Sequence, residues 1–88
     1  MKISQQKKEK ISEQILAFLY SKNPQALFTS HIAREVARDE EFTKRLLLEL
    51  EEKKFVLSIQ KNPKGITYTR RIRWKLSPTA YQAYSSSQ

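Results

Sequence analysis

Residues 55–77 read FVLSIQ, then KNPKG, then ITYTRRIRWKLS, and the rest of the expected fold is arranged around them. The two outer parts are rich in β-branched and aromatic residues, which favour strands. Between them, Asn62, Pro63 and Gly65 suit the first, second and fourth positions of a type I turn. The segment therefore predicts a β-hairpin, with two antiparallel strands joined by a tight turn.

A hairpin closed at this turn, with Lys61 opposite Ile66, has one register. That register pairs Phe55 with Ile72, Leu57 with Arg70, and Ile59 with Tyr68. Because side chains alternate between the faces of a strand, these residues would form a mostly apolar face, which Trp74 and Leu76 would continue. The opposite face would carry Val56, Ser58, Gln60, Thr67, Thr69, Arg71, Arg73 and Lys75. We therefore expect one apolar face and one basic, hydroxylated face.

The positive charge of the chain lies on this hairpin and on the residues just before it. The 88 residues contain 17 Lys and Arg and 9 Asp and Glu, a formal net charge of +8. Residues 1–52 hold nine cations and nine anions, so they sum to zero. The remaining cations, with no acidic residue among them, are Lys53, Lys54, Lys61, Lys64, Arg70, Arg71, Arg73 and Lys75. This one-sided charge favours a polyanionic partner, nucleic acid first and an anionic membrane surface second.

The composition excludes several classes of function. Eighty-eight residues make one domain, and the absence of Cys argues against disulfides and thiolate metal sites and favours the cytoplasm. His31 is the only His, so we expect no metal site. No apolar run approaches the roughly 20 residues that cross a bilayer, so we expect no membrane partner. With one Gly and no recognisable nucleophile context, we expect no enzyme, catalytic residue, cofactor or small-molecule substrate.

Hydrophobic spacing predicts three helices before the hairpin. The first would run from about residue 4 to residue 21, where Asn23 and Pro24 stop it. The second would have Thr29 or Ser30 as its N-cap and end near residue 38. The third would begin at an Asp39 N-cap, with acidic residues in a first turn that favours negative charge, and end near residue 54.

Short elements complete the predicted order. Residues 26–28 are too few for a helix, and we expect a third strand there that pairs with Trp74 and Leu76. Ser77 and Pro78 suit an N-cap and first helical position, which predicts a final helix over residues 79–84. The expected domain covers residues 11–84. Residues 1–10 would be a basic arm or the start of the first helix, and residues 85–88 a flexible tail.

Two segments resemble a known family. TSHIAREVARDEEFTKRLLLELEEKKFV (residues 29–56) resembles the helix-turn-helix of winged-helix transcriptional regulators, whose third helix commonly closes with a Leu-Glu-Glu-Lys-Gly-Leu-Val-like run. WKLSPTAYQAY (residues 74–84) resembles the junction after the wing in regulators of the MarR and PadR type. The chain departs from the pattern at Lys54, where the family often has Gly. The resemblance implies an α+β winged helix-turn-helix fold, with a three-helix core, a small antiparallel sheet that includes the wing hairpin, and a short C-terminal helix.

The resemblance also implies double-stranded DNA binding and a role in transcription regulation, with the third helix in the major groove. The residues then available on this helix are Glu40, Glu41, Lys44, Arg45 and Leu48. Residues 31–52 hold four positive and seven negative charges, which is unfavourable for entry into a polyphosphate groove. Lys44 and Arg45 could contact a phosphate or a guanine edge, or pair with Glu40, Glu41 or Glu49 along the helix.

The wing is the stronger candidate for DNA binding. Arg71, Arg73 and Lys75 would share one strand face, and Lys61 and Lys64 would lie on the turn, so the cluster could follow a phosphate backbone or place an Arg in the minor groove. The alternative is a basic sheet face that only meets solvent. The predicted DNA-binding residues are Lys44, Arg45, Lys61, Lys64, Arg70, Arg71, Arg73 and Lys75.

Other classes stay open. The domain could be a protein-interaction module of a larger nucleic-acid complex, with the acidic third helix against a basic partner. It could also bind RNA or single strands through aromatics such as Tyr68 and Trp74, although their place on the apolar face favours a core role. A homodimer is a further expectation, because one such domain offers few DNA contacts. Tyr81, Tyr84 and the apolar residues of the first helix would supply its surface.

Overall fold

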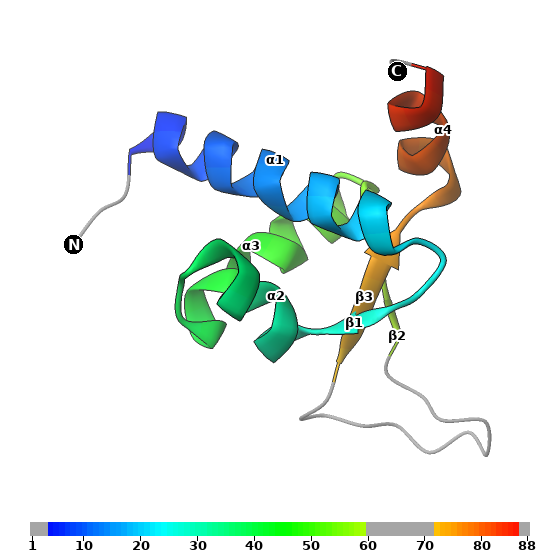
Figure 1. The fold of residues 1–88 in the computed structure, drawn as a ribbon. Coiled ribbons are helices and arrows are strands. Elements are labelled where there is room, and N and C mark those ends of the chain that lie inside the picture. Colours follow the sequence, from blue (N-terminus) through cyan, green and yellow to red (C-terminus); the bar gives the residue numbers. More distant parts are fainter. Residues whose placement is uncertain (1–3, 60–71, 87–88) are drawn as a thin grey trace.

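The computed structural model describes residues 4–59 and 72–86 (Figure 1). In chain order the elements are α1 (Gln5–Lys22), β1 (Leu27–Phe28), α2 (Thr29–Val36), α3 (Glu40–Glu52), β2 (Val56–Ile59), β3 (Arg73–Leu76) and α4 (Pro78–Ser86). The three strands form an antiparallel sheet in the order β1-β3-β2. The predicted α+β architecture of three helices, a small sheet and a C-terminal helix is confirmed.

Helix α1 begins where Ser4 caps it. The Ser4 hydroxyl accepts a hydrogen bond from the Lys7 backbone N–H at 3.2 Å, as an N-cap does. Ile11, Ile15 and Leu19 recur every four residues and are buried, so they form the inward stripe of the helix. Residues 5–10 belong to α1.

The turn between α2 and α3 is built by backbone hydrogen bonds. Ala37 adopts a left-handed conformation with φ 57°. The N–H of Arg38 donates to the carbonyl of Ala33 at 3.0 Å, which is the long hydrogen bond of a Schellman motif. Asp39 then caps α3 as predicted, because its carboxylate accepts a hydrogen bond from the Phe42 N–H at 2.7 Å.

The end of α3 repeats this motif at Lys54. Lys54 has φ 68°, and the N–H of Phe55 donates to the carbonyl of Leu50 at 2.9 Å. A residue with a Cβ is disfavoured in this left-handed conformation, and glycine is not. The conformation gives a physical reason why Gly suits this position in the family that the sequence resembles.

The predicted N-cap of α2 is wrong. The helix begins at Thr29, and Phe28 occupies the cap position without a side-chain capping bond. The Thr29 hydroxyl is used elsewhere: it accepts a hydrogen bond from the indole N–H of Trp74 at 2.8 Å. Trp74 is 0% exposed, and a buried indole N–H needs an acceptor. The buried indole N–H of Trp74 therefore determines where the Thr29 hydroxyl points.

The register of β2 against β3 also differs from the prediction. Leu57 pairs with Lys75, five residues beyond Arg70, and Ile59 pairs with Arg73. The predicted pairs of Phe55 with Ile72, Leu57 with Arg70 and Ile59 with Tyr68 are therefore wrong. A shift by an odd number of residues exchanges the two faces of the shifted strand. The turn predicted at residues 62–65 lies outside the described residues.

The exchange of faces follows from what the core needs. Val56 lies opposite Leu76 and is 0% exposed, whereas Leu57 is 43% exposed. In this register Val56 extends the apolar surface that Trp74 and Leu76 present to the core. On β3 the predicted assignment of residues to faces is confirmed. Trp74 and Leu76 are buried, whereas the alternating residues Arg73 and Lys75 are only partly buried.

Strand β1 pairs with β3 as predicted. Leu27 lies opposite Trp74, and Phe28 lies opposite Arg73. Leu76, the other predicted partner, pairs with β2 instead. The core then draws residues from all seven elements: Ile11, Ile15, Leu19, Leu27, Ile32, Val36, Leu46, Leu47, Leu50, Val56, Trp74, Leu76 and Ala80. One contiguous core therefore fixes the sheet against the helices.

Helix α4 packs on the end of α1 through tyrosines. Ser77 caps α4 as predicted, since its hydroxyl accepts a hydrogen bond from the Ala80 N–H at 3.1 Å. The ring of Tyr20 lies 5.3 Å from that of Tyr81 and 5.5 Å from that of Tyr84, between centroids. Burial and the nearby charge of Glu13 raise the pKa of Tyr84 above its ordinary value of 10.0. Tyr81 and Tyr84, predicted as part of a dimer surface, thus pack on Tyr20 of α1 within the domain.

Replacing Lys54 with Gly should stabilise the protein. The substitution removes a left-handed strain of about 1 kcal/mol, offset in part by the greater freedom of Gly in the unfolded chain. We expect a net gain of about 0.5 kcal/mol in the free energy of unfolding, measured by urea denaturation at unchanged m. Lys53→Gly is the matched control: Lys53 has φ −81°, so its loss should cost about 0.5–1 kcal/mol. Equal destabilisation by both variants would contradict the left-handed assignment of Lys54.

Replacing Thr29 with Val should destabilise the protein by leaving the Trp74 indole N–H without its acceptor. The expected cost is about 1–3 kcal/mol in the free energy of unfolding, measured by urea denaturation. Thr29→Ser keeps the hydroxyl and should cost less than about 1 kcal/mol, the value of one buried methyl group. A Ser variant as unstable as the Val variant would show that the hydroxyl does not matter.

Candidate nucleic-acid interface

The eight predicted DNA-binding residues divide into two sets. Lys61, Lys64, Arg70 and Arg71 lie outside the described residues. The structure describes Arg73 and Lys75 on β3, and Lys44 and Arg45 on α3. These four residues and their neighbours form the described part of the candidate interface.

The outer face of the sheet carries Arg73 and Lys75. Directly opposed residues share a face, so Arg73 lies in a row with Phe28 and Ile59, and Lys75 lies beside Leu57. We name these five residues the outer sheet face. Both cations are half-buried, and neither forms an ion pair within residues 4–59 and 72–86. The apolar neighbours can cover the aliphatic stems while the charged ends stay in solvent.

An aromatic contact restrains Arg73. Its guanidinium carbon lies 5.9 Å from the centroid of the Phe28 ring, within the range of a cation–π interaction. The other neighbour of Phe28 is His31 at the start of α2, with ring centroids 5.8 Å apart in an edge-to-face arrangement. Phe28 thus connects α2 to the basic strand and limits the positions of the guanidinium.

Helix α3 presents a second candidate surface. Thr43, Leu46, Leu47 and Leu50 are buried, so the helical period places the exposed residues opposite them. The exposed residues on that outward side are Glu41, Arg45, Leu48 and Glu52, with Lys44 at its edge, and we name these five residues the α3 stripe. Leu48 is 43% exposed and supplies an apolar patch among charged neighbours.

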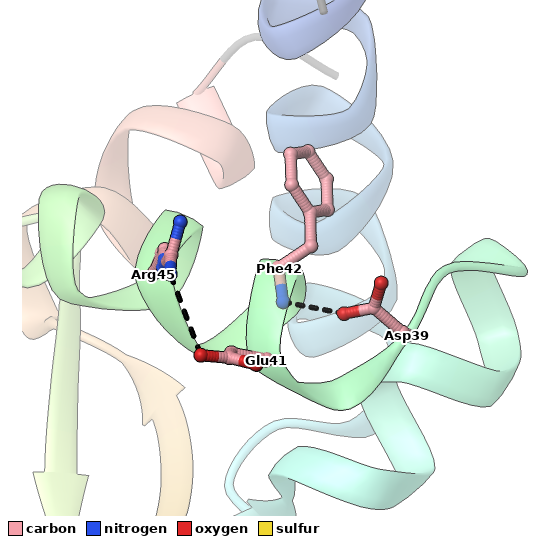
Figure 2. Close-up of polar contacts among 4 residues, drawn as sticks. All are labelled: Asp39, Glu41, Phe42 and Arg45. Atoms are coloured by element: carbon pink, nitrogen blue, oxygen red, sulfur yellow. Dashed lines mark hydrogen bonds and ion pairs between the residues drawn. The ribbon is translucent and has the colours of Figure 1, made fainter. Parts of the chain in front are cut away.

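Arg45 pairs along the helix with Glu41. Its Nη2 lies 3.4 Å from Oε1 of Glu41, four residues earlier, and the two side chains are 75% and 80% exposed (Figure 2). The sequence left helix pairing open as the alternative to DNA contact, and the structure shows this pairing. Exposed pairs of this kind contribute only about 0.3–0.5 kcal/mol, so another partner can displace the Glu. Lys44 has no ion-pair partner in the described part of the chain.

Two other acidic residues of α3, Glu49 and Glu51, serve the fold. Glu49 pairs with Lys8 of α1 at 3.1 Å instead of with Lys44 or Arg45. The Glu51 carboxylate accepts hydrogen bonds from the backbone N–H and the hydroxyl of Ser58 on β2. These carboxylates hold α3 to its neighbours. The seven negative charges counted in the sequence therefore overstate the charge on the α3 stripe.

Sequence reasoning missed three members of the outer sheet face. Leu57 and Ile59 were expected on the apolar side, and Phe28 was given no place at the interface. Side chains alternate between the two faces of a strand, so an inward Leu27 implies an outward Phe28. That alternation was a sequence signal that could have placed Phe28 on the outer face. The long-range pair of Lys8 with Glu49 has no local sequence signal, because 41 residues separate them.

Two features of residues 4–59 and 72–86 bear on metal and small-ligand binding. Among the described residues, no three His, Cys, Asp or Glu side chains come together as metal ligands. A hollow of about 230 Å³ lies between α1 and α3, lined by Leu16, Phe55 and the paired Lys8 and Glu49 among others. This volume is below the roughly 300 Å³ at which small-molecule pockets begin. No helix in the described ranges is long and apolar enough to span a bilayer.

Comparison with known proteins gives matches among solved structures. No family model matches the chain, and no curated protein matches it. MepR of Staphylococcus aureus, a transcription regulator of the multidrug efflux pump MepA, is 22% identical, with a TM-score of 0.67 over 88% of this chain and 55% of its own. A double mutant of ZitR from Lactococcus lactis is 18% identical, with a TM-score of 0.69 over 99% of this chain and 51% of its own.

A third similar structure contains DNA. The S. aureus MepR–DNA complex is 25% identical, with a TM-score of 0.68 over 92% of this chain and 68% of that one. The chain thus spans about half the length of the MepR and ZitR chains in the first two comparisons. These likenesses define the class: the chain folds as a winged helix-turn-helix domain like that of MarR-type transcription regulators. The fold expected from the sequence resemblance is confirmed.

Removing either partner of the exposed pair on α3 should leave stability nearly unchanged. Glu41→Gln keeps the length of the side chain and deletes its charge, whereas Arg45→Gln deletes the charge and also shortens the side chain. We expect each to change the free energy of unfolding by no more than about 0.5 kcal/mol, measured by urea denaturation. A loss of several times that amount would show that the pair supports the fold.

Proposed function

We propose that this chain is the DNA-binding domain of a transcription regulator, and that it binds double-stranded DNA mainly through its basic wing strand. The observation that carries the proposal is the outer sheet face. Arg73 and Lys75 lie there together, without an acidic partner among the described residues, while the buried residues of β3 face the core. Unbalanced cations on one face suit a polyphosphate.

The contacts around these cations favour the backbone of DNA as partner. The Phe28 ring restrains the Arg73 guanidinium, so less conformational freedom is lost when it meets a phosphate. The sequence adds Lys61, Lys64, Arg70 and Arg71 between the two strands, and we propose these as further contacts. Phosphate contacts of this kind give affinity and orientation, and they carry no sequence information by themselves.

Helix α3 would then support binding at the base edges. Its exposed stripe holds Lys44, Arg45 and Leu48, which offer a phosphate contact, a guanine contact and an apolar contact for a thymine methyl group.

DNA-bound MepR shares this fold, which supports duplex DNA as the partner. Single-strand binding by Trp74 is disfavoured, because its ring is fully buried and cannot stack on a base. A homodimer is part of the proposal and would show in light scattering as twice the mass of the chain.

The salt dependence of duplex binding tests the proposal. If about five phosphates are neutralised, log K should fall with log salt at a slope of about −4.5, measured by fluorescence anisotropy on a random-sequence duplex. Replacing Arg73 and Lys75 together with Gln should weaken binding about 10-fold and reduce the slope by about 1.8, since two phosphate contacts are lost.

A matched control removes the same charge elsewhere. Lys10 and Lys22 are exposed on α1, and replacing both with Gln should leave the slope unchanged. Far-ultraviolet circular dichroism confirms that all variants fold. A slope near zero for the unaltered protein, or equal losses in the two double variants, would overturn the proposal.

A further inference from the structure

We propose that Glu41 is a positioning residue that holds Arg45 ready to read a guanine in double-stranded DNA, so that this pair sets a sequence preference. The inference rests on the proposed function and deepens it. Figure 2 shows the two side chains one turn apart on α3, joined by the contact of Arg45 Nη2 with Glu41 Oε1 at 3.4 Å. Both side chains are exposed, so the pair is open to a macromolecule.

The start of α3 gives this pair a fixed base. The Asp39 carboxylate accepts a hydrogen bond from the Phe42 N–H at 2.7 Å (Figure 2). The Asp39 carbonyl accepts a second hydrogen bond, from the Thr43 hydroxyl at 2.9 Å. Phe42 packs against the core, and Thr43 is fully buried. These contacts set the rotation of the first turn, so Glu41 and Arg45 are held on the outward side of the helix.

The geometry leaves Arg45 able to bind a base. A guanidinium has five N–H donors in a plane, and the Glu41 contact uses Nη2. The remaining donors can make the two parallel hydrogen bonds to O6 and N7 of a guanine. A flexible Arg could equally reach a phosphate, which would carry no sequence information. The negative charge of Glu41 opposes the full negative charge of a phosphate at this place more than it opposes a guanine edge, whose acceptors carry only partial charges.

Glu41 would position Arg45 in the complex with DNA and not in the free domain. In solvent the pair is weak, because water screens both charges. When α3 enters a groove, water is excluded and the same contact strengthens. Glu41 would therefore contribute to base preference without contributing to folding, which separates a positioning role from a structural one. Leu48, on the same stripe, would meet a neighbouring apolar group such as a thymine methyl.

The experiment is a selection from a library of random-sequence duplexes, read by sequencing. The proteins compared are the unaltered chain, Glu41→Gln, Arg45→Gln and the double variant. We expect the unaltered chain to enrich sites with a fixed guanine at one position. Glu41→Gln and Arg45→Gln should each reduce the preference for that guanine about 10-fold, and the double variant should lose no more than Arg45→Gln does.

Glu40→Gln is the matched control. Glu40 is exposed in the same first turn, its loss changes the charge equally, and it has no ion pair among the residues that the structure describes. It should keep the guanine preference. Equal effects of Glu40→Gln and Glu41→Gln, or a guanine preference that survives in Arg45→Gln, would overturn the inference.

The two proposals fail in different ways. If the unaltered chain binds random duplexes with the expected salt dependence and enriches no sequence, the positioning role of Glu41 is wrong and the proposed function stands. If the unaltered chain binds no duplex at low salt, the proposed function is wrong, and the inference falls with it.

Discussion

The structure depends on the burial of Trp74. Its ring is fully enclosed, its indole N–H is satisfied by Thr29 at 2.8 Å, and its strand lies between the other two. Because side chains alternate along a strand, an inward Trp74 forces Arg73 and Lys75 outward. The same residue thus anchors the core and determines which face of the sheet is basic. Charge segregation in this protein is a consequence of core packing.

Contacts that support the fold also determine where several acidic residues lie. A count along residues 31–52 suggests a helix-turn-helix too negative to approach DNA, yet Asp39 caps α3, and Glu49 and Glu51 hold it to α1 and β2. The carboxylates with these roles are committed to the fold. What reaches the outward side is a mixed stripe of acidic, basic and apolar side chains, in which Glu41 pairs with Arg45. A stripe of mixed charge suits selective contacts with bases. General attraction to phosphate is better supplied by the outer sheet face, which carries Arg73 and Lys75.

Much of the fold could be predicted from the sequence, because its signals are local. Helical spacing and the caps at Asp39 and Ser77 depend on neighbouring residues, and they were found. The register of β2 was missed because it follows from the packing of Val56 with Trp74 and Leu76, which lie far along the chain, and not from the local turn signal on which the prediction relied. The role of Thr29 was missed because its partner lies 45 residues away. For the candidate site, sequence alone named the cations and offered Glu41 as one of three partners for Lys44 and Arg45, whereas the contact of Phe28 with Arg73 needed the structure.

A two-dimensional amide nuclear magnetic resonance titration with a random-sequence duplex would show which face of the domain meets DNA. If the face opposite Trp74 binds the duplex, the amides of Phe28, Arg73 and Lys75 should shift strongly. Smaller shifts should appear on the outward side of α3, while the amides of α4 stay in place. Shifts concentrated on α1 and α4, with the amides of Arg73 and Lys75 unmoved, would contradict binding through the sheet.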